Sequence, residues 1–280
     1  MKSKSTYKHH KFNLSIYLPF ASCKFQEYLA YRANVFMFLI GDILKILCMY
    51  FLWKAIFVSS GQDILKGFSL PDMITYLLLS ISTASCIPQD TGQIVTEIKN
   101  GSIVMTLIKP ISYRLKTYFT SLGDTIYTII FLMIPCLIAS FIINYIYGNL
   151  SVYTVSGILL FIISFCFSMY INMCLNFLLG CMTFVTLNIW GILQIYRAIN
   201  QLLSGVLIPL VFFPEWAKNI INYLPFASII STPINIFLGK YTGVVALQAI
   251  VLQIIWMLLL HISTEITWRA VVKRLVVQGG

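Results

Sequence analysis

The stretch "LIPLVFFPEWAKNIINYLPF", residues 207–226, combines three prolines, an acid, a base and a tryptophan with apolar runs. A plain membrane-spanning helix does not favour prolines or charges in its interior. A water-exposed loop, in turn, does not favour long apolar runs. How this stretch folds therefore depends on whether the rest of the chain lies in a membrane.

The composition indicates an integral membrane protein. Of the 280 residues, 59% are hydrophobic and 10% are charged, and the mean hydropathy is +0.87. A soluble domain carries about 25% charged residues, so this chain has too few charges to cover a water-exposed surface. The seven cysteines are odd in number and lack zinc-finger or CxxC spacing. They are therefore expected to be small buried hydrophobes, with no disulfide framework and no metal site.

Six stretches are long and apolar enough to cross a bilayer as helices. They are Asn34–Phe57, Leu70–Gln89, Tyr118–Ile143, Tyr153–Leu178, Cys181–Phe213 and Val244–Thr264. The fold class predicted is an all-α membrane protein with six transmembrane helices, because the stretches lack the alternation of a barrel strand. The boundary between the fourth and fifth helices is the weakest. It is indicated only by Asn172, Asn176, Gly180 and Asn188.

The distribution of basic residues predicts the orientation. Thirteen lysines and arginines lie in the N-terminal segment, the loop between the second and third spans and the C-terminus, against four in the opposite loops. Since cytoplasmic loops carry the excess of Lys and Arg, both termini are predicted to be cytoplasmic. The basic charge also suits a surface of anionic membrane lipid, and nucleic acid is not an expected partner.

Three regions follow from this topology. Residues 1–33 are expected to form a cytoplasmic tail and an interfacial helix with Phe25, Tyr28 and Leu29 on one face. Residues 34–267 form the six-span domain, and residues 268–280 form a basic cytoplasmic tail. A cleaved signal peptide is not expected, because polar residues and a proline interrupt the short apolar stretch near the N-terminus.

The cytoplasmic loop at residues 93–116 predicts two short helices with a corner at Gly101. An Asn-Gly pair is typical of a helix C-terminus, Ser102 can cap the next helix, and Pro110 ends it. We expect the loop to dock on a cytoplasmic protein, a simple connector on the membrane surface being the alternative. The residues assigned to this coupling element are Glu97, Lys99, Asn100, Gly101, Ser102 and Pro110. The two charged residues among them are expected to face water.

Three charged residues fall inside predicted spans. Asp42 and Lys45 are three residues apart on the first span, and Arg197 lies in the fifth. Each such charge costs about 2.5–3.5 kcal/mol on insertion scales, so intramembrane charges usually face the bundle interior. Asp42 and Lys45 are expected either to form an ion pair, to line a substrate path or to contact another subunit. Arg197 has no acid nearby in sequence and needs a partner from another helix or from lipid headgroups.

By this topology, residues 207–238 lie at the outer face. Two short helices with a proline corner at Pro225 predict a re-entrant hairpin at residues 214–239, which is tolerated at membrane depth when packed on protein. Pro214 suits the first turn of a helix, where Glu215 lies at the positive end of the helix dipole. The residues assigned to this outer re-entrant gate are Pro209, Pro214, Glu215, Trp216, Pro225, Phe226 and Pro233.

The chain lacks the motifs of an enzyme. It has no GxxxxGK[ST] phosphate loop, no HExxH and no GxSxG. His261 is the only histidine outside the N-terminal pair, and it is expected to hold a hydrogen-bond partner rather than to catalyse. No catalytic residue, cofactor or metal ligand is therefore predicted in this chain.

Several stretches resemble one family of membrane proteins. "LLSGVLIPLVFFPEWAKNIINYLPFASIISTPINIFLG" at 202–239 resembles a proline-hairpin pattern of six-span bacterial ABC exporter permeases in the type-two, drug-and-peptide export superfamily. "EIKNGSIVMTLIKPISY" at 97–113 is similar to the coupling loop of that family. "YLAYRANVFMFLIGDIL" at 28–44 and "WRAVVKRLVVQGG" at 268–280 are similar to its opening span and its C-terminus.

The resemblance implies a permease of the bacterial plasma membrane that works as a dimer with itself or with a second, similar permease. A separate ATP-binding subunit, which binds ATP and Mg, would drive export. The loop around Gly101 would be its coupling helix, and the proline hairpin an outer re-entrant gate. The substrates of such families range over antibiotics, peptides, lipids and glycans. A stand-alone channel or secondary transporter is the main alternative, followed by a membrane enzyme acting on lipid.

Overall fold

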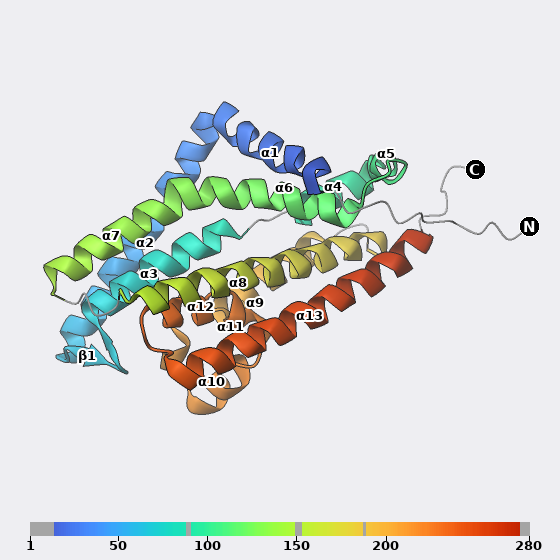
Figure 1. The fold of residues 1–280 in the computed structure, drawn as a ribbon. Coiled ribbons are helices and arrows are strands. Elements are labelled where there is room, and N and C mark those ends of the chain that lie inside the picture. The colour runs from blue at the N-terminus through green and yellow to red at the C-terminus, as the bar shows by residue number, and fades with distance from the viewer. Residues whose placement is uncertain (1–13, 88–90, 149–152, 187–188, 275–280) are drawn as a thin grey trace, which may run out of the picture.

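The computed structural model describes residues 14–87, 91–148, 153–186 and 189–274, which form an elongated bundle of helices (Figure 1). Its long helices are α1 (Leu18–Ala30), α2 (Arg32–Ser60), α3 (Leu70–Cys86), α6 (Tyr113–Thr128), α7 (Ile134–Ile146), α8 (Val155–Cys181) and α13 (Gly243–Arg274). A π-helical turn, η2 (Ile129–Met133), joins α6 to α7 into one rod. The predicted all-α architecture is confirmed in these long elements.

Shorter elements connect the long helices. These are η1 (Leu14–Ile16), α4 (Thr91–Lys99), α5 (Ile103–Leu107), η4 (Met182–Phe184), α9 (Trp190–Leu203), η5 (Leu210–Phe212), α10 (Glu215–Ile221), α11 (Pro225–Ile229) and α12 (Ser231–Phe237). Two strands, β1 (Ile64–Leu65) and β2 (Phe68–Ser69), pair antiparallel between α2 and α3. Their two-residue turn has positive φ at Lys66 (46°) and Gly67 (85°), the geometry that a tight hairpin requires.

Among the described residues, five helical stretches are long and apolar enough to cross a membrane by length and composition. They are Phe36–Ser60, Leu70–Lys99, Tyr113–Ile146, Val155–Phe184 and Gly243–Lys273. The second stretch comprises α3 and α4, and residues 88–90 between them are not described. The five stretches begin close to five of the six predicted spans. The protein is thus a multi-pass helical membrane protein, while the count of six spans stays a prediction.

The predicted fifth span, Cys181–Phe213, does not form one helix. Its main helix, α9, has 14 residues, which extend for about 21 Å at 1.5 Å per residue. This is shorter than the hydrocarbon core of about 30 Å. The helix ends at Leu203 because Gly205 adopts a left-handed conformation with φ 85°, and Pro209 follows in an extended one.

The predicted break between the fourth and fifth spans also differs. Helix α8 continues without interruption through Asn172, Asn176 and Gly180 to Cys181, so these residues do not form a turn. Gly180 serves close packing instead, since a Cβ there would lie 2.8 Å from the Ile94 side chain of α4. Asn188 lies outside the described residues.

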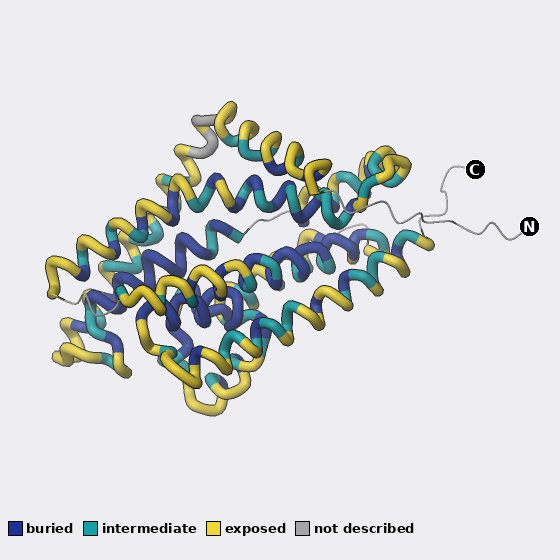
Figure 2. Tube along the Cα trace, in the orientation of Figure 1, coloured by how far each residue is buried: buried dark blue, intermediate teal, exposed yellow. Residues whose placement is uncertain are grey.

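Helix α3 is the central element of the bundle. Fourteen of its 17 residues are buried, whereas α2 is largely exposed and lies at the periphery (Figure 2). On the other side of the core, α8 packs against α12 and α13. Apolar packing alone gives little preference for helix association in a membrane, so polar contacts between helices matter.

A buried polar cluster ties three elements together. The Gln253 side chain on α13 donates a hydrogen bond to the Ser228 carbonyl of α11 over 2.8 Å and accepts one from Ser164 on α8 over 2.9 Å. Ser168 donates to the same Ser228 carbonyl over 2.9 Å. These bonds satisfy a backbone carbonyl that would otherwise be orphaned where the short helices dip into the bundle.

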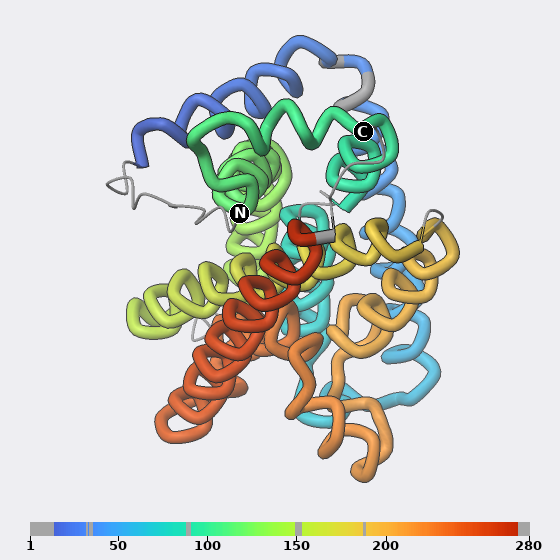
Figure 3. Tube along the Cα trace, turned by 90° about the vertical axis from the view of Figure 1, so that its right-hand side faces the viewer, coloured from blue at the N-terminus to red at the C-terminus, as the bar shows by residue number. Residues whose placement is uncertain are grey.

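A helix, α1, forms where an interfacial helix was predicted; it ends at Ala30 and is separated from α2 by Tyr31, and its position at the membrane surface stays a prediction. It lies along α6 (Figures 1 and 3). Its contact with α6 is close because a Cβ at Gly123 would lie 2.4 Å from the Ala21 carbonyl oxygen. Tyr28 stacks on Tyr127 with ring centroids 4.8 Å apart, whereas Leu29 on the predicted face is exposed.

Helix α13 extends beyond the predicted end of the last span. It continues past Thr264 to Arg274, so the first part of the predicted basic tail at 268–280 is helical. Trp268 stacks on Tyr113, their ring centroids 5.0 Å apart, which holds this end of α13 against the start of α6.

Candidate functional site

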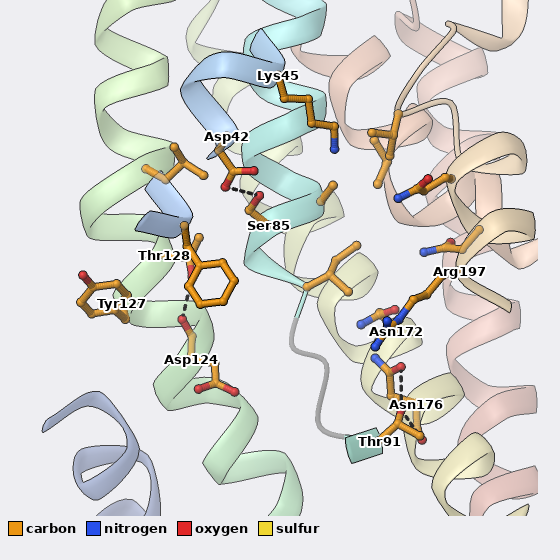
Figure 4. Close-up of a pocket in the computed structure, with 18 of the residues that line it drawn as sticks. Asp42, Lys45, Ser85, Thr91, Asp124, Tyr127, Thr128, Asn172, Asn176 and Arg197 are labelled. Carbon is orange, nitrogen blue, oxygen red and sulfur yellow. Dashed lines mark hydrogen bonds between the residues drawn. The ribbon is translucent and has the colours of Figure 1, made fainter. Parts of the chain in front are cut away.

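A pocket of about 510 Å³ lies among α2, α3, α6, α8 and α9. The structure brings all three predicted intramembrane charges into its lining, although they come from distant parts of the sequence (Figure 4). The charged and amide side chains that line the pocket are Asp42, Lys45, Asp124, Asn172, Asn176, Arg197, Asn200 and Gln201. A polar cavity of this kind, inside an apolar bundle, is the principal candidate for a binding site.

Asp42 and Lys45 both face the pocket from α2. The Ser85 hydroxyl of α3 donates a hydrogen bond to Asp42 Oδ2 over 2.8 Å. The ion pairs within the described part of the chain do not include one between Asp42 and Lys45. Of the alternatives drawn from the sequence, the geometry favours a lining role over a mutual ion pair.

Arg197 reaches into the pocket from α9 toward Asn172 on α8 (Figure 4). The ion pairs of the described residues give it no acidic partner. Asn172 is 0% exposed, and within the described structure neither of its amide atoms has a hydrogen-bond partner. A buried polar group left unpaired costs about 1–3 kcal/mol, so its retention here requires an explanation.

Asn176 lies one turn further along α8 and also lines the pocket. Thr91, the first residue of α4, donates a hydrogen bond to Asn176 Oδ1 over 3.1 Å. The pocket is therefore directly connected to the helix that leads into the predicted coupling loop. Sequence reasoning interpreted Asn172 and Asn176 as turn signals. Their spacing of four residues, which places both on one face of a helix, is the signal that identifies them as lining residues.

The predicted corner at Gly101 is present. Helix α4 ends at Lys99, Asn100 follows, Gly101 adopts φ 70°, and α5 begins at Ile103. Ser102 stands at the N-cap position of α5, as predicted, but its φ of −66° and ψ of −15° are helical and its side chain makes no capping bond. Its hydroxyl instead donates to the Glu97 carbonyl of the preceding helix over 3.4 Å, which braces the corner.

Ion pairs anchor the corner to the bundle. Glu97 was expected to face water, but its side chain is only 17% exposed, because it pairs with Lys116 of α6 over 2.8 Å. Arg114, two residues earlier on α6, pairs with Glu265 of α13 over 2.8 Å. Lys99 is exposed as expected, and α5 ends at Leu107, ahead of Pro110. The first turns of α6 thus connect α4 to α13.

The tip of the corner presents apolar side chains to its surroundings. Val104, Met105 and Ile108 are all exposed there, beyond the ion-paired base of the corner. Grouped exposed apolar residues next to basic ones are typical of a protein or membrane contact.

The proline hairpin consists of three short helices rather than two. Helix α10 is separated from α11 at Pro225, as predicted, and a second bend at Ile230 (φ −125°) separates α11 from α12. Pro214 is the residue before α10 rather than within its first turn, since its ψ of 146° is not helical. Glu215 is then the first helical residue and pairs weakly with Lys218 over 3.7 Å.

The two ends of the hairpin differ in burial. Trp216 on α10 is 72% exposed, whereas Pro225 and Pro233 are buried in α11 and α12. Phe226 lies near the Tyr196 ring, with centroids 6.2 Å apart. Pro209 precedes η5, which lies against the strand hairpin and the end of α2 through Phe212.

Lys240, which follows the hairpin, joins it to α3 and to the turn between the two strands. Its ammonium group donates to Asp72 Oδ2 over 2.8 Å and to the Gly67 carbonyl over 2.8 Å. The end of the hairpin is thereby connected to the first turn of α3 and to the strand turn. Neither partner is close to Lys240 in sequence, so sequence reasoning did not find this contact.

The histidine, cysteine and acidic residues in the described part of the chain form no cluster of three or more that could hold a metal ion. His261 shares a hydrogen bond with the Tyr170 hydroxyl, as expected for a histidine with a structural partner.

A family model described as ABC-2 family transporter protein matches residues 43–279. The chain belongs to the ABC-2 family of transporter proteins. The match includes the coupling loop, the pocket residues from Lys45 onward and the entire hairpin. No curated protein matches the chain.

Membership of the ABC-2 family confirms the resemblance drawn from the sequence. It makes the chain a membrane permease of an ABC transporter, a transport subunit that is not itself catalytic. ABC-2 permeases generally work with an ATP-binding subunit, which defines the kind of partner to expect.

Proposed function

We propose that the chain is one permease of a dimeric, ATP-driven exporter in the bacterial plasma membrane. The match to the ABC-2 family over residues 43–279 carries this proposal. The chain has no phosphate-binding loop of its own. A separate ATP-binding subunit therefore binds ATP and Mg, and a second copy or a related permease completes the translocation path.

The α4–α5 corner is the proposed docking element for the ATP-binding subunit. Its tip carries the exposed residues Val104, Met105 and Ile108, and its base is held by the Glu97–Lys116 ion pair. A force on the tip is thereby transmitted to α6 rather than absorbed by a loose loop. Through Thr91 and Asn176, the same helix reaches the pocket.

The peripheral helix α2 supports assembly with a second permease. Its membrane-spanning window is only 6% buried within one chain and presents large apolar side chains along most of its length. Together with α9 and the hairpin, it would face the second permease and lipid. On this proposal α9 and residues 204–213 form the fifth of six crossings, and the buried parts of the hairpin re-enter the membrane from outside.

A stand-alone channel or secondary transporter is the second candidate. The observation that favours it is the gathering of Asp42, Lys45, Asp124 and Arg197 in one pocket, because intramembrane ionisable groups often mark ion pathways. The two candidates differ in their need for ATP.

We expect the chain to purify with an ATP-binding subunit when the two are expressed together, and to hydrolyse no ATP when purified alone. The measurement is phosphate release by the chain, by the partner and by the complex, each in lipid nanodiscs. Transport into vesicles that contain only this chain would support the channel or secondary transporter instead.

The proposed topology of the hairpin predicts a labelling pattern. The test uses Tyr223→Cys and Thr242→Cys, each in a background without native cysteines. Both positions are exposed, and they lie on either side of α11 and α12. Both should react with an impermeant thiol reagent added to intact cells. Lys99→Cys is the cytoplasmic control and should react only after the cells are permeabilised. If one hairpin position reacts only after permeabilisation, the segment crosses the membrane and is not re-entrant.

A further inference from the structure

We propose that the pocket among α2, α3, α6, α8 and α9 binds the headgroup of a zwitterionic amphiphile. Its anionic group would lie at Arg197 and Asn172, and its cationic group at Asp42. This names a substrate class and rests on the proposed function for its biological meaning, although the binding itself can be measured on the permease alone.

The charges of the pocket favour a ligand that carries both signs. Two basic and two acidic side chains line it. Asp42 and Asp124 approach from α2 and α6, whereas Arg197 and the amides of α8 form the facing wall (Figure 4). A ligand with a single charge would meet like charges on one of the two walls. A zwitterion with separated charges is complementary to both.

The wall formed by α8 and α9 is suited to an anion. Arg197 offers a planar guanidinium, which binds phosphate and carboxylate groups with two parallel hydrogen bonds. Beneath it, Asn172 is fully buried and its amide has no partner within the described structure. An anion drawn to Arg197 would supply the acceptor that the Asn172 NH₂ group lacks. This accounts for a polar group that is otherwise only a cost to folding.

The wall formed by α2 is suited to a cation. The hydrogen bond from Ser85 occupies one carboxylate oxygen of Asp42 and fixes the orientation of the group. The other oxygen, Oδ1, makes no hydrogen bond among those of the described residues, and an ammonium group can donate to it. Lys45, one turn along α2, points into the pocket between the two walls and adds attraction for the anion.

The surroundings of the pocket supply a place for a hydrocarbon chain. Phe38 on α2 and Phe131 in η2 line the same pocket and are exposed at its edge. They continue into the apolar surface of α2, which faces lipid or a second permease. A headgroup inside the pocket with its chain along this surface leaves no charge in hydrocarbon and no apolar group against the polar walls.

The test compares three fluorescent amphiphiles with the same short acyl chain and different headgroups. One carries phosphoethanolamine, which is zwitterionic, one phosphoglycerol, which is anionic, and one a primary ammonium. Binding is measured by fluorescence anisotropy on the purified full chain in amphipol, below the critical micelle concentration of each probe. We expect the zwitterionic probe to bind at least about tenfold more tightly than either of the others, because it gains one more charge-assisted hydrogen bond.

Single substitutions test which wall of the pocket binds the anionic group of the ligand and which binds the cationic group. Arg197→Ala should weaken the zwitterionic and anionic probes about tenfold and should not weaken the cationic one. Asp42→Asn should weaken the zwitterionic and cationic probes and should not weaken the anionic one. Lys54→Ala removes an exposed cation from the same helix as Lys45, outside the pocket, and should change none of them.

Thermal unfolding checks that each variant is folded, and Arg197→Gln, which removes the charge but keeps a long polar side chain, replaces Arg197→Ala if the latter is not. An apolar tripeptide with free termini carries both charges without an acyl chain. If it competes as well as the phosphoethanolamine probe, the zwitterion site serves peptides rather than lipids. Equal affinity for the three probes, or probe affinities unaffected by Arg197→Ala and Asp42→Asn, would overturn the proposal. Neither result depends on an ATP-binding subunit, so the proposed function is tested separately.

Discussion

Gly205→Val is expected to lower the unfolding temperature of the permease by roughly 10 °C, as for a loss of about 3 kcal/mol. The residue has φ 85°, and a valine there strains the backbone by about 1–2 kcal/mol. A Cβ would also lie 2.7 Å from the Tyr76 hydroxyl, which is buried in the centre of α3. The new side chain would therefore displace Tyr76, whose hydroxyl donates to the Gly205 carbonyl over 2.8 Å.

Gly239→Val is the matched control for this variant. Gly239 also has positive φ, 66°, but a Cβ there would meet nothing within 4 Å. This variant carries the backbone strain without the steric overlap, so its unfolding temperature should fall by roughly half as much or less. Both are measured by thermal unfolding of the detergent-solubilised chain, followed by size-exclusion chromatography. Equal decreases in the two variants would show that the Gly205–Tyr76 contact does not hold α9 and the hairpin against α3.

The contrast between Gly101 and Gly205 shows what sequence can predict here. Gly101 was identified in advance because the Asn-Gly pair, the helix before it and the proline after it are all local. The role of Gly205 depends on Tyr76, which is 129 positions away in the chain. Local chemistry therefore predicted the corner at Gly101, and only the folded structure shows why the predicted fifth span ends early.

The same distinction applies to the pocket. Asp42, Lys45 and Arg197 were recognisable because charges are rare in this chain, yet nothing in the sequence indicates that α2 and α9 border the same pocket. Asn172 was misread because asparagine in an apolar run is a turn signal when its neighbours are unknown. In α8 the surrounding apolar residues keep the helix intact, and the amide becomes part of a polar wall. The sequence identifies the charged and polar residues that are unfavourable inside a membrane, and the tertiary structure shows that they gather in one pocket.

Gly101→Val is expected to lower the substrate-stimulated ATP hydrolysis of the assembled transporter by roughly five- to thirtyfold, as for a strain of about 1–2 kcal/mol. The glycine has φ 70°, and a Cβ there meets nothing within 4 Å, so the cost is confined to the backbone of the corner. The strain is relieved if α5 changes its direction relative to α4, which moves Val104 and Met105 at the docking tip. The unfolding temperature should change little, because the Glu97–Lys116 pair and the packing of α4 on α8 are untouched.

Gly101→Asn is the matched control, since asparagine adopts the left-handed conformation more readily than other non-glycine residues. It should keep most of the stimulation, although it adds a larger side chain at the same position. Basal ATP hydrolysis and the amount of ATP-binding subunit that purifies with each variant are measured alongside. A direct role of the corner in coupling requires two results. The valine variant must lose stimulation while the ATP-binding subunit stays bound, and the asparagine variant must keep its stimulation. If both variants behave like the original chain, then residues 93–116 only connect two spans, and the force from ATP hydrolysis must enter the bundle elsewhere.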